Sequence, residues 1–213
     1  QVLDNKLMKK YKMSFTAGTI LQNESISFAK LYLEVGDWDV ALDEATSSNV
    51  LQSRTVSTAK RISLETLSRL KTLNNEELEL LVDGDDQEQL HLLWLSVCRC
   101  YPFIYDFSID VIRDKVLTLS YQLSHDDFDV FFNAKMQWHE ELEKIAETTR
   151  YKLRQVLFKM MTEVGFINKE GGINPATLSE RVVRLICKKT CEDLLLFPVN
   201  STILQGYQEC HMI

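Results

Sequence analysis

Apolar residues recur every three or four positions along most of this chain, which is the period of amphipathic helices. The clearest example opens the stretch between Thr148 and Lys189. Its apolar stripe consists of Leu153, Val156, Leu157, Met160, Met161 and Val164. This stripe predicts a helix from Thr148 to Val164, which Gly165 ends at a C-terminal cap position.

The residues that follow Gly165 indicate a tight reversal and then another helix. GFINKEGGINPATL has two short apolar pieces around Asn168 to Gly172, a pattern typical of a small β-hairpin or wing. Ser179 then caps the next predicted helix, on which Arg181, Arg184 and Lys188 share one face. Together these pieces are similar to the recognition helix and wing of a winged helix-turn-helix.

The same period predicts helices over most of the remaining chain. One begins near Ala17 or Thr19 and ends at Gly36, and another covers residues 53–72. SHDD at residues 124–127 is a capping box that opens a predicted long acidic helix reaching to about Thr149. We therefore expect an all-α, compact multi-helix fold that has winged-helix-like elements and at most one short β-hairpin.

Seven glycines and three prolines are few for 213 residues, which fits a chain that is mostly helical. The length allows one large or two small domains. We predict an N-terminal helical domain over residues 8–122, which contains the basic helix 53–72. The C-terminal helical domain then covers residues 123–213 and contains the winged-helix-like segment 148–189.

Charge is distributed unevenly along the chain. The whole chain carries a formal charge of −7, yet residues 148–189 contain nine basic and three acidic residues, a balance of plus six. From Arg54 to Lys71 there are five basic residues and one acidic, a balance of plus four. A negative chain does not coat nucleic acid indiscriminately, but it can carry local basic patches that neutralise phosphates.

Ten of the basic residues in these two regions are the candidate phosphate contacts. They are Arg54, Lys60 and Arg61 in the first region, and Arg150, Lys152, Arg154, Lys159, Arg181, Arg184 and Lys188 in the second. Gln155 is the polar side chain on the second basic helix best suited to reading a base edge, adenine in particular. The alternative interpretation is that both stripes are ordinary solvated helix faces.

Residues 75–88 have the opposite sign, with seven acidic residues and no basic one. Because these carboxylates alternate with leucines on a capped helix, we interpret them as a solvated face and not as a cation site. No phosphate-binding loop, nucleophile elbow or zinc-protease spacing is present. The prediction is a protein without catalytic residues, cofactor or metal.

Compartment and membrane association follow from two simple observations. The longest apolar run, Leu92 to Cys98, is far shorter than the roughly 20 residues of a spanning helix. Five cysteines form an odd number without the spacing of a disulfide framework, which fits a reducing compartment. We expect a cytoplasmic protein that has no membrane span and is monomeric.

Several stretches together resemble a known family. KKYKMSFTAG, LQSRTVSTAKRI, FIYDFSIDVIRDK, FFNAKMQWHEELEKI and TTRYKLRQVLFKMM are similar to segments of the BrxA family of bacterial BREX (bacteriophage exclusion) defence systems. The likeness extends from Met8 to about Val199. It implies a small, all-helical accessory protein that works beside a DNA methyltransferase and other large partners, and it supplies no catalytic residue.

The resemblance also implies DNA binding through helix-turn-helix-like elements, which coincides with the two basic helices. The hypothesis is a non-enzymatic protein that contacts the backbone of double-stranded DNA with weak sequence specificity. One alternative is an adaptor that docks other BREX proteins through the acidic residues 75–88 and the basic helices. RNA binding is a second alternative, because phosphate contacts alone do not distinguish the two nucleic acids.

Overall fold

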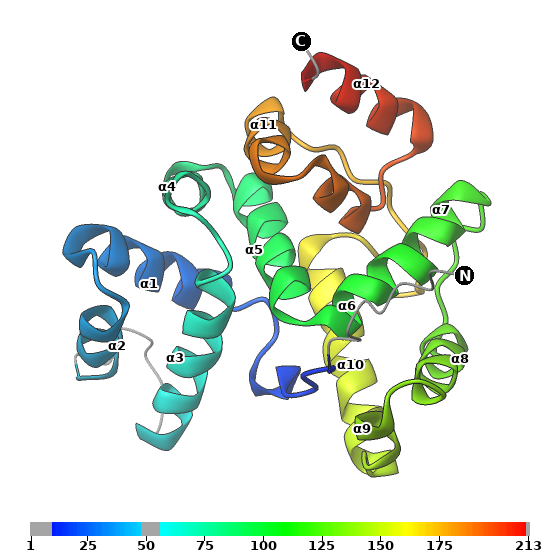
Figure 1. Cartoon of the computed structure of the whole chain (residues 1–213), viewed down its shortest axis with the longest axis horizontal. Helices are drawn as coiled ribbons and strands as arrows, with labels where there is room; N and C mark the ends of the chain where they lie inside the picture. The colour runs from blue at the N-terminus through cyan, green and yellow to red at the C-terminus, as the bar shows by residue number, and fades with distance from the viewer. Residues whose placement is uncertain (1–9, 48–55, 212–213) are drawn as a thin grey trace, which may run out of the picture.

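Helix α5 (Asp86–Cys100) runs through the middle of the molecule (Figure 1). The structure is a computed structural model and describes residues 10–47 and 56–211. Every side chain of α5 from Leu90 to Cys98 is buried, because this helix is apolar nearly all the way round. Helices from both halves of the chain pack against it, namely α1, α3, α4, α6, α10 and α11.

The prediction of an all-α fold is confirmed, and no sheet forms within the described residues. The helices before α5 are η1 (Phe15–Ala17), α1 (Gln22–Val35), α2 (Trp38–Ser47), α3 (Val56–Leu70) and α4 (Asn75–Asp83). Those after it are α6 (Pro102–Phe107), η2 (Ser108–Arg113), α7 (Asp114–Leu117), α8 (His125–Met136), α9 (Glu140–Glu143), α10 (Glu147–Val164), α11 (Glu180–Lys189), η3 (Cys191–Leu196) and α12 (Ser201–His211).

A short reversal follows α10, as the sequence predicts. Gly165 takes a left-handed conformation (φ 86°) that ends the helix. The Asn168 amide then donates to the Gly172 carbonyl at 2.9 Å, which closes the turn. The returning residues pair with the segment before α8, since the Leu123 amide donates to the Gly171 carbonyl at 2.8 Å. Residues 121–123 therefore lie beside the reversal at 166–174.

Two predicted helix boundaries are wrong. α1 begins at Gln22 and not near Ala17, because Leu21 lies in the left-handed region with φ 56°. The long acidic helix is interrupted at residues 137–139 and again at residues 144–146, which divides it into α8, α9 and the start of α10. His139 leaves the helical path and stacks on Tyr11 with ring centroids 3.8 Å apart, so a contact with the distant N-terminal segment outweighs local helix propensity.

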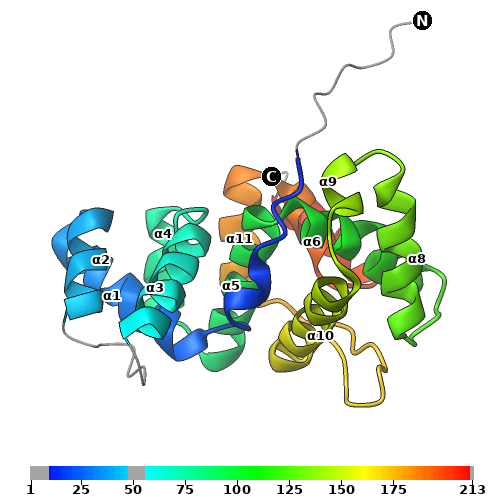
Figure 2. The same cartoon turned by 90° about the horizontal axis from the view of Figure 1, so that it is seen from below.

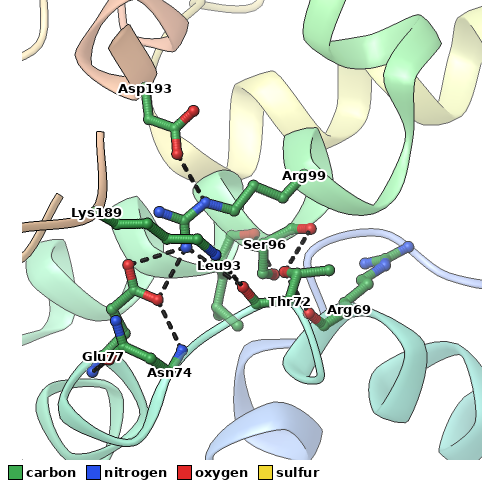
Figure 3. A network of polar contacts seen from close by, with 9 residues as sticks. All are labelled: Arg69, Thr72, Asn74, Glu77, Leu93, Ser96, Arg99, Lys189 and Asp193. Atoms are coloured by element: carbon green, nitrogen blue, oxygen red, sulfur yellow. Dashed lines mark hydrogen bonds and ion pairs between the residues drawn. The ribbon is translucent and has the colours of Figure 1, made fainter. Parts of the chain in front are cut away.

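A buried ionic cluster centred on Arg99 joins three parts of the chain (Figure 3). The Arg99 guanidinium of α5 donates to Glu77 of α4 at 2.8 Å and to Asp193 of η3 at 2.8 Å. Glu77 is completely buried, and it also accepts the Asn74 backbone amide in the capping box of α4. The interpretation of residues 75–88 as a uniformly solvated face is therefore wrong for Glu77.

The buried apolar side chains from the two halves of the chain form one cluster. On the C-terminal side, the Trp94 indole of α5 donates to the carbonyl of Leu196 at 3.0 Å. The division into two domains stays a prediction. The packing around α5 does place α10 and α11 in fixed positions relative to the N-terminal helices.

The Arg99 cluster predicts a large stability effect. Arg99→Met leaves the buried carboxylates of Glu77 and Asp193 without their cation, so the free energy of unfolding falls by about 3–5 kcal/mol. Urea denaturation followed by circular dichroism measures this change. Arg113→Met is the matched control, because Arg113 has no ion pair among the described residues, and it changes stability by less than about 1 kcal/mol. Equal effects of the two changes would contradict the role assigned to Arg99.

The backbone conformation of Gly171 predicts a second effect on stability. Its φ is +82°, and an added Cβ would lie 2.3 Å from the Leu123 carbonyl oxygen. Gly171→Ala therefore destabilises the protein by about 1–3 kcal/mol and loosens the reversal. Gly206→Ala in α12 is the control, since a Cβ there meets nothing within 4 Å, and it stabilises the fold slightly. Thermal unfolding of the two variants compares them directly.

Candidate nucleic-acid interface

The outer face of α10 carries three of the predicted contact residues in exposed positions. Lys152, Gln155 and Lys159 lie on this face, opposite the buried Leu153, Leu157 and Met160. Lys152 has no ion pair among residues that the structure describes, and Lys159 reaches Glu163 only at 3.9 Å. The Gln155 amide donates to the Tyr151 hydroxyl at 2.9 Å, so this amide is held against the helix surface.

Arg150 and Arg154, two further predicted contact residues, lie against the neighbouring helix α8. Arg150 Nε donates to Asp129 of α8 at 2.9 Å, and Arg154 forms an ion pair with the same carboxylate. Arg150 also lies over the Phe132 ring, 4.5 Å from its centroid. Both guanidiniums are largely buried, so they fasten α10 to α8 and do not form part of the exposed basic stripe. Their assignment as phosphate contacts stays a prediction, and in this structure each guanidinium is already bound to the Asp129 carboxylate.

The three predicted contact residues of α11 are also bound to acidic neighbours. Arg181 forms an ion pair with the buried Glu88 at the first turn of α5, where Ser179 donates to the same carboxylate at 2.6 Å. Burial alone raises the pKa of Glu88, but the hydrogen bonds from Ser179, the Asp85 backbone and Arg181 outweigh it and lower this pKa. Glu88 is thus the second residue of the acidic segment that is buried and not solvated.

The other two predicted contact residues of α11, Arg184 and Lys188, lie further along the helix. Arg184 pairs with Glu180 one turn earlier at 2.5 Å, and Lys188 pairs with Glu76 of α4 at 2.5 Å. These two pairs are more than half exposed, so either cation can exchange its partner at little cost. α11 is therefore a weaker candidate surface than its charge predicts.

The basic stripe of α3 stays exposed over its described part. Lys60 and Arg61 are both solvent-exposed and have no ion pair among the described residues. Arg54, the third residue of this predicted patch, lies outside the residues that the structure describes. The N-terminal ends of α3 and α10 point toward the same edge of the molecule, the lower edge of Figure 1, and both face the viewer in Figure 2.

The structure adds Lys169 to the exposed cations near α10. It lies at the tip of the reversal and lines a depression of about 550 Å³ together with Lys159 and with Ser124 and His125 at the first turn of α8. Lys169 is one of the nine basic residues of segment 148–189 but is not among the predicted phosphate contacts. Its position at the tip of a predicted wing is the signal that identifies it.

The C-terminal end of α11 carries a disulfide between Cys187 and Cys191, whose Cα atoms are 4.2 Å apart. This pair spans four residues at the end of one helix, so it connects no distant parts of the chain and does not form a disulfide framework. Cys98 and Cys100 of α5 are free thiols, and burial raises the pKa of both. No group of three His, Cys, Asp or Glu residues in the described ranges is arranged to hold a metal ion.

None of the described helices is both long enough and apolar enough to cross a bilayer.

The family model and the three relatives that match this chain all come from one family. The BrxA family model matches residues 9–190. The BREX protein BrxA of Escherichia coli is 25% identical over 151 residues, which are 71% of this chain and 71% of that protein. The BREX protein BrxA of Bacillus cereus is 28% identical over 130 residues, 61% of this chain and 65% of that protein. The BrxA of Paramagnetospirillum magneticum is 26% identical over 158 residues, 74% and 79% of the two chains.

A solved structure has the same fold. The crystal structure of an uncharacterized protein from Magnetospirillum magneticum superposes with a TM-score of 0.77 at 20% sequence identity. The match covers 89% of this chain and 98% of that one. The arrangement of helices around α5 therefore has an experimental counterpart.

Because Asp129 binds both Arg150 and Arg154, its carboxylate should contribute to the stability of the protein. Asp129→Asn removes the charge that holds Arg150 and Arg154, so the free energy of unfolding falls by about 1–3 kcal/mol. Asp126→Asn, on the same helix, removes a carboxylate that has no ion pair among the described residues, and it leaves stability within about 0.5 kcal/mol. Thermal unfolding measures both, and equal shifts would show that Asp129 does not hold the two helices together.

Proposed function

This chain belongs to the BrxA family, and we propose that this BREX phage-defence component binds double-stranded DNA through the outer face of α10 and the reversal at 166–174. Lys152, Lys159 and Lys169 provide the main phosphate contacts, and Lys60 and Arg61 of α3 provide a second set. The observation that carries the proposal is the row of exposed lysines on α10 and the reversal, which no strong internal ion pair occupies.

The order of elements around α10 supports this proposal. An extended segment at 121–123 precedes α8, the short α9 and then α10 follow, and the reversal at 166–174 returns to pair with 121–123. A winged helix-turn-helix has this order, and its second helix enters the major groove while the wing contacts the neighbouring backbone. Arg150 and Arg154 fix the angle between the two helices through Asp129.

Few side chains on this surface are suited to reading bases. Gln155 is the one amide on the outer face of α10, and Tyr151 occupies its donor in this structure. Lysine contacts to phosphates carry no sequence information. Binding is therefore weakly specific, and its affinity falls steeply with salt because bound counterions are released.

Within the defence system, the protein serves as a binding component. It acts by binding and not by catalysis, as a cytoplasmic accessory monomer that functions beside other BREX proteins. An adaptor without nucleic-acid binding, or a protein that binds RNA, would behave differently in the experiment below.

The test is binding to a labelled non-specific DNA duplex across a salt series, with a matched RNA duplex in parallel. Lys152→Ala/Lys159→Ala weakens DNA binding by at least roughly tenfold at low salt and reduces the slope of log affinity against log salt by about 2, since two phosphate contacts are lost. Lys60→Ala/Arg61→Ala reduces the slope by a similar amount if α3 contacts the same duplex. Fluorescence anisotropy measures both quantities.

Lys30→Ala/Lys71→Ala is the charge-matched control, since these exposed lysines lie elsewhere on α1 and at the end of α3. It leaves the salt slope almost unchanged. Absence of DNA binding at low salt would overturn the proposal in favour of the adaptor alternative. An equal loss of DNA affinity in the control variant would show that the overall positive charge, and not the surface of α10, governs binding. Tighter binding to the RNA duplex would show that the ligand is RNA.

A further inference from the structure

A second surface lies on the other side of α8, away from α10. A groove of about 420 Å³ separates α8 from η2 and α7. Val111 and Phe131 form part of its apolar lining, while Asp129 of α8 points to α10 and is not part of it. The same helix thus contributes to two surfaces that have different chemistry.

Acidic side chains line both rims of this groove. Asp110 and Asp114 come from η2 and α7, and Asp126 and Asp127 come from the first turn of α8. Lys115 is the one basic residue among those that line the groove, so its formal charge is about −3. A surface of this sign repels phosphates and attracts cationic groups.

Two of the four carboxylates form ion pairs with lysines of this chain, and the other two are available to bind cations of a partner. Asp110 binds Lys135 at 2.9 Å, and Asp127 binds Lys115 at 2.9 Å. Burial alone raises the pKa of Asp127, but the hydrogen bonds from Lys115 and Ser124 outweigh it and lower this pKa, so the carboxylate stays ionised. Asp114 and Asp126 are exposed and have no ion pair within the part of the chain that the structure describes.

Apolar side chains stand exposed beside these carboxylates. Val130 lines the groove and is 69% exposed. Leu117 and Leu119 flank the lining residue Thr118, and Leu119 is 72% exposed with a φ of 57°. A leucine in the left-handed region costs backbone energy, and in this position it presents an apolar side chain to water.

The backbone of one rim is irregular as well. η2 is a π-helical segment at Ser108–Arg113 between the α-helical turns of α6 and α7. It carries Asp110 and Val111, both of which line the groove. π-Helical turns displace side chains from regular helical spacing and occur frequently at functional sites.

We propose that the groove between α8 and the η2–α7 segment binds a basic amphipathic helix of a partner protein. Apolar residues on one face of that helix contact Val111 and Val130, and its Lys or Arg residues pair with Asp114 and Asp126. Charge complementarity selects this occupant, because the acidic rims repel nucleic acid and attract lysines and arginines. The apolar lining favours a helix that has leucines or valines exposed on one face. The proposal does not depend on DNA binding by α10.

The experiment uses the full chain and a synthetic peptide of about five helical turns, with leucines on one face and lysines on the other. Fluorescence anisotropy measures its binding to the wild-type protein, and the expected result is saturable binding. Asp114→Lys/Asp126→Lys weakens it at least roughly tenfold, because two attractive contacts become repulsive. Val130→Ser weakens it by roughly threefold or more through lost apolar contact.

Three comparisons separate the groove from the general negative charge of the chain. Glu79→Lys/Asp83→Lys places the same charge change at exposed positions of α4, and it leaves binding within about twofold. A peptide of equal composition whose leucines are scattered binds weakly. Lys152→Ala/Lys159→Ala does not reduce peptide binding, so the outcome is independent of the proposed DNA surface. Absence of wild-type binding, equal loss in the α4 control, or equal binding of the scattered peptide would each overturn the proposal.

Discussion

This fold depends on one constraint, which is that carboxylates buried at the first turns of helices must be neutralised. Glu77 and Glu88 each complete a capping box, at the first turns of α4 and α5. Packing then removes both from water, and a buried carboxylate needs a cation or several donors nearby. Arg99 meets this need for Glu77, while Arg181 and Ser179 meet it for Glu88.

These pairs also connect distant parts of the sequence. Arg99 binds Asp193 of η3 as well as Glu77, so one guanidinium joins α4, α5 and the C-terminal region (Figure 3). Arg181 ties α11 to the start of α5 in the same way. Apolar packing against α5 provides a large contact area but does not by itself fix the orientation of the helices that pack there. The ion pairs are directional, and they determine the position of each helix around α5.

The same interactions decide which basic residues remain for a partner. A guanidinium that already satisfies a carboxylate cannot bind a phosphate without leaving that carboxylate unpaired. Arg150 and Arg154 therefore orient α10, whereas Lys152, Lys159 and Lys169 stay exposed along its outer side. On α8, Asp129 faces this basic helix, and Asp126 and Val130 face the acidic groove. One short helix thus separates a surface suited to phosphates from one suited to cations.

Local sequence determined the helical character of the chain and several helix ends. Ser124, Ser179 and Gly165 act at the predicted caps, because capping depends on hydrogen bonds and backbone angles within a few residues. Tertiary structure alone decided the break at residues 137–139, where His139 meets Tyr11 from the other end of the chain. It also decided the roles of the charged side chains, since Asp129 lies 25 residues before Arg154, and Glu88 lies 93 residues before Arg181. Helical spacing shows which side of a helix is polar, but a charge is free or paired according to what the fold brings next to it.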